Sequence, residues 1–530
     1  MDAADRDCQT EPGAWSRTLK EALQARGLEL RETHISLVFL DADRVYKVRK
    51  AVDLGFLDFR TLQARRDDCE RELLLNRRFS SGVYLELVPI TGDDDGRLQL
   101  GGAGEPLEWA VAMRRLPDGD SALARLEAGH LERDDVVHLA DEIAAFHERC
   151  EHGAHIDRFG SRELIEQNVI ENFEQTRSQA LEVLSAQALA EIERFQRGFL
   201  AQHDALLSRR IAQARIRDGH GDLRLEHCYL DADGSVQIID CIEFNERFRF
   251  GDVCADIAFL SMDLRWHGRH DLAETLLASY ARQSGDYELY ALVNFYESYR
   301  AYVRAKVSSM LADDASADEA VRARARRDAR KYYLLAEASG RESLEAPVIY
   351  AVGGWIASGK STLSEALSEA LNAPIVDADH TRKALSQVAP ETPLHDAAFS
   401  DHYSDETSDR VYAELRRLAA GIVESGRPVV VDASFRSRRH RAALRELAAE
   451  LGCRLVFVEC KVAAEVCHQR LVERARGTSV SDGRLEIFDD FVARFEPFDE
   501  LPPEQHCAID TCTTDLQDNL AAVLAVAGAR

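Results

Sequence analysis

The sequence predicts an α+β region with a small, mainly β lobe and a larger helical lobe, followed by an α/β domain with a parallel sheet. Two strand-like segments, His34 to Leu40 and Val45 to Lys50, are joined by a polar turn and predict a β-hairpin. Helical periodicity dominates from Asp134 to Arg210 and again from Asp256 to Ala338. After residue 346, strand-sized apolar runs alternate with helices, which is the pattern of a parallel sheet.

The remaining elements of the first region follow from the same signals. A helix is predicted from about Thr61 to Phe79, because buried-type residues recur on one face. Turns rich in Gly and Asp then separate short strands, and strand-sized runs return inside the helical region. The short strands are Tyr84 to Ile90, Arg97 to Leu100 and Trp109 to Arg115, and the runs inside the helical region are Arg215 to Asp218 and Val236 to Asp240.

The charge balance limits the partners of the chain. Its 530 residues include 66 Lys and Arg against 93 Asp and Glu, a net charge of −27. Such a surface repels polyanions, which argues against a nucleic-acid partner. The basic run Arg436 to Arg441 is a local candidate for a polyanion site, although runs of this kind are common on solvated helices.

The lack of a targeting or membrane-spanning stretch and the cysteine pattern predict a cytoplasmic protein with reduced thiols. No stretch reaches the ~18 apolar residues of a membrane span, so no membrane association is expected. Eleven cysteines occur without a C-x-x-C pair, so zinc spacing is absent and we expect reduced thiols. Nothing in these patterns specifies an oligomeric state.

A first set of polar residues has the composition that phosphate transfer to a hydroxyl requires. That chemistry needs a carboxylate near the acceptor proton, a carboxylate on Mg²⁺, and a lysine held by a helix glutamate. The candidates are Asp222 as the catalytic base, Asp240 as the metal ligand, Lys47 as the phosphate lysine and Glu72, or alternatively Glu70, as its partner.

The order of these motifs over about residues 30 to 310 resembles the aminoglycoside phosphotransferase and choline-kinase-like branch of the protein-kinase-like fold. In that branch the catalytic loop reads H-G-D, as in His220-Gly221-Asp222, and a G-D-x-x-x-D element follows, as in Gly251 to Asp256. The resemblance implies ATP as the phosphate donor, with Mg²⁺, and a structural role for His220 and Asp256.

Two departures from that branch bear on activity. Five residues after Asp222, where the branch has an asparagine on the second Mg²⁺, stands His227, a softer ligand. No G-x-G-x-x-G occurs near the first hairpin. His227 is kept as a metal candidate, with Glu243 or Asn245 as possible replacements. A degenerate kinase fold that only binds or regulates is the alternative.

The second region begins with a complete G-x-x-x-x-G-K-S motif, Gly354 to Ser361, directly after the apolar run Val348 to Val352. Its glycines let backbone N–H groups face a β-phosphate, its lysine adds charge on the β/γ oxygens, and its serine offers a hydroxyl to Mg²⁺. A glycine-rich turn without a ligand is the alternative. The predicted nucleotide-binding residues are Gly354, Ser358, Gly359, Lys360, Ser361 and Thr362.

Three further strands are predicted, each followed by a helix: Pro374 to Asp377, Pro428 to Asp432 and Arg454 to Glu459. Asp432 is predicted to order Mg²⁺ or its water shell opposite Ser361. Alternatively, Asp432 caps the next turn through Ser434.

Acceptor and lid residues are expected around this site. Asp379 is predicted to face the acceptor hydroxyl and Arg382 the anionic part of the substrate, although Asp379 has an alternative role as the N-cap of the helix near His380. Arg470 and Arg474 lie one helical turn apart, where they can close over the triphosphate, or simply occupy a solvated face.

The segment from Pro347 to about Pro497 resembles small-molecule and polynucleotide-type P-loop kinases, including gluconate kinase and zeta-toxin relatives. It holds A-S-G-K-S-T, D-A-D-x-x-R, V-D-A-S-F and R-x-x-x-R in that order. Together the two halves resemble a bacterial fusion family described as bifunctional aminoglycoside phosphotransferase-like and ATP-binding proteins.

The expected organisation is a kinase-like domain at 1–337, a linker at 338–346 and a P-loop kinase-like domain at 347–530, because Gly340 and Pro347 frame a polar segment. The resemblances imply an ATP-dependent phosphotransferase that uses Mg²⁺ and passes the γ-phosphate to a hydroxyl of a small molecule. A regulatory ATP-binding protein and a polynucleotide-type 5′-hydroxyl kinase are the alternatives.

Overall fold

The computed structural model describes residues 12–33, 35–53, 57–93, 97–315, 317–341, 343, 346–388, 404–474 and 484–528. The contacts of the chain divide it into two compact units. The first unit consists of Met1–Arg177 and Arg197–Leu264, and the second of Ser178–Gln196 and Arg265–Arg530.

An antiparallel sheet opens the first unit. Its strands lie in the order β1 (Glu29–Glu32), β2 (Ser36–Leu40), β3 (Arg44–Arg49), β6 (Glu108–Arg114), β4 (Tyr84–Gly92) and β5 (Leu98–Leu100). The predicted hairpin is confirmed as β2 and β3, with Val38 opposite Lys47. Strand β1 and the preceding helix α1 (Pro12–Gln24) were not predicted, because β1 is largely charged and exposed.

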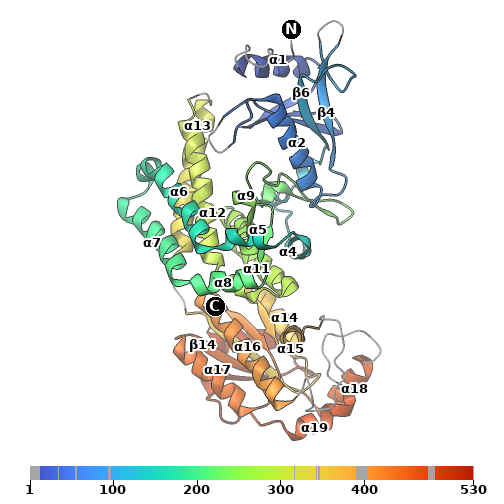
Figure 1. Ribbon diagram of the computed structural model, residues 1–530. Coiled ribbons are helices and arrows are strands. Elements are labelled where there is room, and N and C mark those ends of the chain that lie inside the picture. Colours follow the sequence, from blue (N-terminus) through green and yellow to red (C-terminus); the bar gives the residue numbers. More distant parts are fainter. Residues whose placement is uncertain are drawn as a thin grey trace. The chain divides into compact units, whose positions relative to one another are not determined.

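Helix α2 (Leu62–Asn76) packs against β4 and β6, as Figure 1 shows. Thr61 begins it as the N-cap, since its side chain accepts the backbone N–H of Ala64. Val45 on β3 packs into the same cluster as α2. Because side chains alternate along a strand, Lys47 and Arg49 also face α2. The opposite face of the sheet packs against residues of α1.

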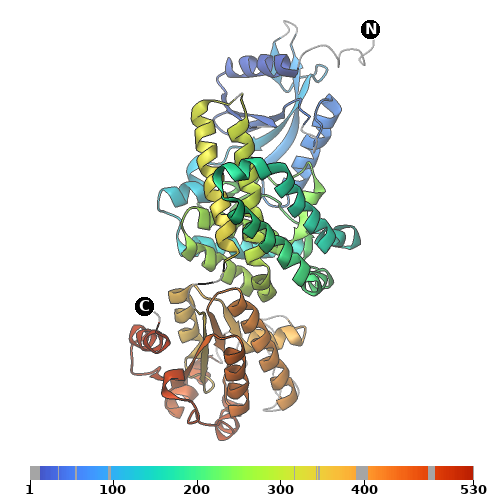
Figure 2. The same ribbon diagram turned by 90° about the vertical axis from the view of Figure 1, so that its left-hand side faces the viewer.

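A largely helical region follows. Its helices are α3 (Ala122–Glu127), α4 (Arg133–Arg149), α5 (Ala154–Asp157), α6 (Arg162–Val183), α7 (Ala186–Gln202), α8 (Asp204–Ala212), α9 (Glu246–Arg249), α10 (Val253–Trp266), α11 (His270–Ser284), α12 (Val293–Asp313) and α13 (Glu319–Ser339). Figure 2 shows α12 and α13, in yellow, packed side by side.

Two short strand pairs interrupt these helices. Strand β7 (Ile216–Asp218) pairs with β10 (Phe250–Asp252), and β8 (Cys228–Leu230) pairs with β9 (Val236–Ile238). The loops after β7 and β9 carry Asp222 and Asp240. These strands therefore position the candidate residues of the first unit.

A parallel sheet forms the core of the P-loop region. Its order is β12 (Ile375–Asp377), β13 (Val429–Asp432), β11 (Val348–Gly354), β14 (Arg454–Lys461) and β15 (His506–Asp510). Every pairing between these strands is parallel. Because β11 is central and successive strands lie on both sides of it, the loops after β11, β12 and β13 meet at one edge, where such sheets bind ligands.

Helices cover this sheet. Helices α14 (Lys360–Leu371) and α20 (Leu516–Ala527) share one hydrophobic core with β11 and β14. Helices α16 (Asp405–Glu424) and α17 (Arg438–Glu450) contact each other and lie in front of the sheet in Figure 1. The remaining helices are α15 (Ala378–Leu385), α18 (Ala464–Arg474) and α19 (Phe488–Ala493).

The predicted fold class is confirmed: an α+β region with an antiparallel sheet precedes an α/β region with a parallel sheet. Among the helices that the structure describes, none is both long and apolar enough to cross a membrane. Each described cysteine is a free thiol.

Candidate active sites

Strand β3 and helix α2 bring a lysine and a glutamate together. The Nζ of Lys47 lies 2.8 Å from Oε1 of Glu72 and 2.5 Å from Oδ1 of Asp240. Burial would lower the pKa of Lys47, but the carboxylates of Asp240 and Glu72 hold it well above its ordinary value. The ammonium is therefore charged and lies between two carboxylates. Glu70, the alternative partner, instead pairs with Arg66 on the exposed side of α2.

Asp240 has a backbone conformation that non-glycine residues seldom adopt, with φ at 64°. Its backbone N–H donates to the hydroxyl of Tyr84 at 3.0 Å, and the N–H of the next residue donates to Oδ1 of Asn76 at 2.8 Å. Burial would raise the pKa of Asp240, but the charge of Lys47 outweighs burial and lowers it. A strained position that neighbouring side chains hold in place is typical of a functional site.

The loop after β7 presents Asp222, and Asp256 holds this loop. The two carboxylate oxygens of Asp256 accept the backbone N–H groups of His220 at 2.6 Å and Gly221 at 2.9 Å. Gly221 has φ at 84°, and a Cβ there would lie 2.7 Å from the carbonyl oxygen of Phe248. Asp256 thus fixes the backbone of the loop, in agreement with the structural role that the resemblance implied.

His220 is held in its neutral form. Its Nε2 lies 2.9 Å from the carbonyl oxygen of Ile239 and must donate to it, while Nδ1 accepts the backbone N–H of Asp222 at 3.3 Å. Burial is the main reason that the pKa of His220 falls from 6.5 to about 4. The unfolded chain therefore binds this proton at a higher pH than the folded chain, and the folded state loses stability as the pH falls from about 6.5 to about 4.

We expect His220→Gln, which keeps a donor for Ile239, to make the protein less sensitive to acid. Between about pH 7 and pH 5 its unfolding free energy should fall by about 2 kcal/mol less than that of the wild type. Denaturant unfolding at the two pH values measures this difference. His155→Gln is the matched control, because His155 is exposed. An unchanged pH dependence in His220→Gln would contradict the assignment.

An arginine binds the candidate base. Nε and Nη2 of Arg224 each lie 3.0 Å from a carboxylate oxygen of Asp222. Arg224 also pairs with Glu226. A carboxylate bound in this bidentate way is a weaker proton acceptor, because protonation would break a charge-assisted pair. Arg224 must therefore release Asp222, at least in part, before Asp222 can act as a base.

His227 lies between the two candidate aspartates. Its Nδ1 donates to the carbonyl oxygen of Asp222 at 2.8 Å, which leaves the lone pair on Nε2, 3.7 Å from Oδ2 of Asp240. One imidazole nitrogen and one carboxylate oxygen can thus face a common cation. Among the described residues no group of three or more His, Cys, Asp and Glu side chains could hold a metal ion. Mg²⁺ bound with a nucleotide needs only one or two protein ligands, because phosphates and water supply the others.

The two replacements suggested for the missing asparagine are engaged elsewhere. Glu243 is buried and pairs with Arg49. Asn245 is the N-cap of α9, where its side chain accepts the backbone N–H of Arg247. His227 is therefore the side chain that the structure brings to Asp240.

Strand β11 continues through the phosphate loop into α14. Gly354 and Gly359 have φ at 141° and 92°, and a Cβ on Gly359 would lie 3.2 Å from Cβ of Thr511. Glycine at these positions lets the loop curve tightly beside its neighbours. The hydroxyl of Ser358 is buried and has no hydrogen-bond partner within the described part of the chain. This hydroxyl is available to a ligand in the loop.

Lys360 and Ser361 begin α14. The Nζ of Lys360 donates to the carbonyl oxygen of Trp355 at 2.8 Å, so the lysine folds back over the loop. The side chain of Ser361 lies beside the carboxylate of Asp432, which ends β13 in register with Val352, and its hydroxyl lowers the pKa of that carboxyl. Burial raises the pKa of Asp432 to about 6, and Lys360 opposes this shift. The lysine, the serine and the aspartate that the sequence assigned to one nucleotide site thus lie together.

The candidate acceptor residues lie on α15. Asp377 stands beside Asp432 in the sheet. Asp379 lies within the first turn, 3.3 Å from Nη1 of the buried Arg382. The carboxylates of Asp377 and Asp379 both raise the pKa of Asp432, after the larger effect of burial. Asp379 and Arg382 are therefore near the phosphate loop, and their roles stay predictions.

One alternative for this region is wrong. The N-cap of α15 is Asp377, whose side chain accepts the backbone N–H of His380 at 2.8 Å, and not Asp379. The helix begins two residues earlier than the sequence suggested, because Asp377 directly ends β12 and can cap it without a connecting turn. Ser434, the suggested capping partner of Asp432, lies 3.2 Å from the hydroxyl of Tyr412.

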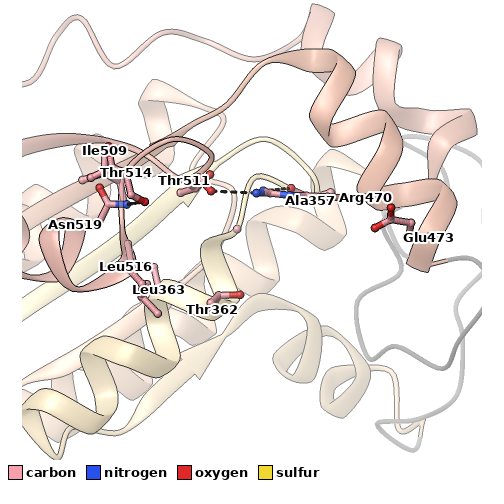
Figure 3. Close-up of a pocket in the computed structure, with 11 residues that line it drawn as sticks. Ala357, Thr362, Leu363, Arg470, Glu473, Ile509, Thr511, Thr514, Leu516 and Asn519 are labelled. Atoms are coloured by element: carbon pink, nitrogen blue, oxygen red, sulfur yellow. Dashed lines mark hydrogen bonds between the residues drawn. The ribbon is translucent and has the colours of Figure 1, made fainter.

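A cavity of about 360 Å³ opens beside the phosphate loop (Figure 3). Arg470 reaches across from α18, where Nη1 donates to the carbonyl of Ala357 at 3.1 Å and Nη2 to that of Thr511 at 3.0 Å. The Thr511 hydroxyl donates to the carbonyl of Ser358 at 2.5 Å. The cavity is lined by Ala357, Gly359, Thr362, Leu363, Arg470, Glu473, Ile509, Thr511, Thr514, Leu516 and Asn519. Its size and mixed lining suit a small organic ligand.

The sequence analysis missed the C-terminal half of this cavity. Strand β15 supplies Ile509, and the turn after it supplies Thr511. The signal was the short apolar run Cys507-Ala508-Ile509 between polar residues, followed by a turn rich in threonine. Arg470 borders the cavity, and its role as a lid residue stays a prediction. Arg474 ends α18, its side chain lies outside the described residues, and its role stays a prediction.

The basic run is neutralised within the chain. Arg436 lies 3.0 Å from Asp405, and Arg441 is buried and lies 2.5 Å from Glu500. Arg438 pairs with Asp499 and Arg439 with Asp409. These pairs compensate the positive charge that made the run a candidate for polyanion binding.

Comparisons with known proteins agree with this geometry. The AAA domain family matches residues 349–498. The chain is 32% identical over 472 residues to the Mycobacterium tuberculosis H37Rv protein described as "Uncharacterized protein Rv2004c", and the match covers 89% of this chain and 91% of that protein.

Two solved structures are also similar. A gluconokinase from Sinorhizobium meliloti 1021 has 25% sequence identity and a TM-score of 0.26, covering 36% of this chain and 94% of that chain. A choline/ethanolamine kinase family protein from Mesorhizobium loti has 14% identity and a TM-score of 0.37, covering 61% of this chain and 99% of that chain. On the strength of the long sequence match, the chain belongs to the family of the mycobacterial protein Rv2004c, and it joins an α+β region with an antiparallel sheet to a P-loop domain.

Proposed function

We propose that this chain is an ATP-dependent phosphotransferase with two kinase-like modules, which transfer the γ-phosphate of ATP to a hydroxyl of a small molecule. The modules are residues 1–337 and 347–530, joined by a linker at 338–346. One observation carries the proposal: Lys360, Ser361 and Asp432 meet at a phosphate loop that borders a cavity of about 360 Å³.

In the second module the phosphate loop and Lys360 would bind the β- and γ-phosphates. Lys360 now donates to a carbonyl oxygen of the loop, and exchanging this neutral acceptor for a phosphate oxygen gains a charge-assisted bond. Ser361 and Asp432 would hold Mg²⁺, which neutralises charge on the phosphates. The cavity beside Arg470 would take the nucleoside part of ATP.

The acceptor would approach from α15 in this module. Asp379 would take the proton of the acceptor hydroxyl, and Arg382 would bind an anionic group of the substrate. Arg470 and Arg474 would stabilise the charge that develops on the transferred phosphoryl group.

In the first module Lys47, fixed by Glu72, would bind the α- and β-phosphates. Asp240 and His227 are the side chains that would hold Mg²⁺ there, and Mg²⁺ would neutralise charge on the phosphates. Asp222 would accept the proton of the acceptor hydroxyl once Arg224 has shifted towards the phosphate oxygens. This exchange keeps the charge of Arg224 compensated throughout.

A regulatory ATP-binding protein is the second candidate for the first module. The bidentate Arg224–Asp222 pair favours it, because the pair occupies the candidate base. So does His227, since imidazole is a less suitable ligand for magnesium. Binding of ATP without turnover would distinguish this candidate from a phosphotransferase.

A 5′-hydroxyl kinase of polynucleotides has less support. The basic run Arg436 to Arg441 is paired with carboxylates, and the net charge is −27. Both observations disfavour a polyanionic substrate.

Transfer of label from [γ-³²P]ATP tests the proposed function. The full chain with Mg²⁺ is incubated with sugars, nucleosides, aminoglycosides and choline-like alcohols, and products are separated from ATP. We expect at least one class of hydroxyl compound to become labelled, and the labelling to depend on Mg²⁺. Label that is released only as inorganic phosphate with every compound would contradict a phosphotransferase.

A further inference from the structure

The face of the sheet that carries Lys47 holds a second buried cation. Arg49 lies two residues after Lys47 on β3, so both side chains leave the same face of the strand. The Arg49 side chain has an exposed fraction of 0%. A cation buried to this extent is retained only where carboxylates compensate it.

Three carboxylates from two parts of the chain compensate Arg49. Its Nε lies 2.6 Å from Oδ2 of Asp68, and its Nη2 lies 2.8 Å from Oε2 of Glu72, both on α2. Nη2 also pairs with Glu243, three residues beyond Asp240. Nη1 donates to the hydroxyl of Ser36 on β2 at 2.8 Å.

Glu72 is the residue that joins Arg49 to the candidate site. Its Oε1 accepts Lys47, and its Oε2 accepts Arg49. Each oxygen of this carboxylate thus has its own cation, which fixes the rotation of the carboxylate as well as its position. With Lys47 alone, Glu72 could rotate about its last bond and keep a single contact.

Glu243 joins Arg49 to the loop that carries Asp240. This loop is also held by the hydroxyl of Tyr84 and the side chain of Asn76. Arg49 therefore contacts α2 on one side and the Asp240 loop on the other. It thus links the helix that carries Glu72 to the loop that carries Asp240, the two carboxylates that flank Lys47.

We infer that Arg49 is a positioning residue for phosphate transfer in the first module: it holds Glu72 and the Asp240 loop in the arrangement that Lys47 requires, before a nucleotide binds. The inference rests on the proposed function of this module. Arginine suits the task because its planar group presents five donors in fixed directions, whereas a lysine has one compact charge. Arg49 does not itself touch substrate.

The test measures the first module in the full chain, with the second site disabled by Lys360→Met. Transfer of label from Mg·[γ-³²P]ATP to the hydroxyl compound labelled in the screen above, together with any released phosphate, gives kcat and KM. Adding Arg49→Lys should lower kcat about tenfold or more, because a displacement of about 1 Å at the reacting groups costs up to about 10²-fold. KM for ATP should change less, since Lys47 remains.

Two further variants separate positioning from folding. Asp68→Asn removes the charge of one anchor on α2 and keeps its shape, so kcat should fall by a smaller factor in a folded protein. Asp67→Asn is the matched control, because Asp67 lies on the exposed side of α2, where it accepts the side chain of Gln63, and its kcat should stay within about twofold of the reference. Circular dichroism and thermal unfolding verify that each variant is folded.

The possible results lead to different conclusions. If the Lys360→Met reference shows no turnover, the proposed function of the first module fails, and the role of Arg49 in it fails too. If the reference turns over and folded Arg49→Lys and Asp68→Asn proteins match it in kcat, the positioning role alone is overturned. If kcat falls in both variants and Asp67→Asn retains it, the inference is supported.

Discussion

Lys360→Met is expected to lower kcat of the second module by about 10²- to 10³-fold, the usual cost of removing one preorganised donor from a transition state. The ammonium of Lys360 lies at the mouth of the phosphate loop, 2.8 Å from the carbonyl of Trp355. Methionine keeps the length of the side chain and removes its charge. The developing negative charge on the γ-phosphate would then lose its nearest cation.

This change should leave the fold intact. Lys360 makes its bond to a backbone carbonyl of an already formed loop, and its aliphatic part can be replaced by methionine. Lys461→Met is the matched control, because Lys461 follows on the same sheet but its side chain is 59% exposed. Labelled-phosphate kinetics in an Asp222→Asn background isolate the second module. Equal kcat in the Lys360→Met and Lys461→Met proteins would refute the role of the phosphate loop.

Asp222→Asn is expected to lower kcat of the first module by about 10²- to 10⁴-fold, the contribution of a positioned general base. Asparagine has the shape of aspartate and cannot accept the proton of a hydroxyl. Asp256 holds the loop by its backbone, so the loop should keep its conformation in the variant. KM for ATP should change little, because Lys47 is assigned to the phosphates and Asp240 to Mg²⁺.

Measurements on the Lys360→Met chain isolate this module. Asp233→Asn is the matched control, since Asp233 lies in the exposed turn between β8 and β9. Should Asp222→Asn and Asp233→Asn turn over ATP at the same rate, Asp222 is not the base. The Arg224–Asp222 pair would then be a structural contact, as in the regulatory candidate.

Much of the fold could be predicted because its signals are local. The hairpin of β2 and β3 and the strand before the phosphate loop are short apolar runs bounded by turns. Strand β1 was missed because most of its residues are charged and because its pairing with β2 is what stabilises it as a strand. Strand β15 was missed because its pairing with β14 joins residues about fifty positions apart in sequence.

In the candidate sites too, residues within motifs could be predicted, and residues placed by tertiary packing could not. Motif residues such as Lys47 and Glu72 were paired correctly in the prediction, because the order of strand and helix places them on facing elements. Arg49, Asn76 and Tyr84 carry no motif, and their contacts with the Asp240 loop depend on tertiary packing. The N-cap of α15 was misplaced by two residues, since both Asp377 and Asp379 have capping side chains.

The central claim is that this chain binds Mg·ATP at two separate places. Isothermal titration of the full chain with the non-hydrolysable Mg·AMPPNP tests it most directly. The account predicts two molecules bound per wild-type chain, one per Lys360→Met chain, one per Asp240→Asn chain and none in the double variant. A single site in the wild type, or two sites retained in either single variant, would contradict it.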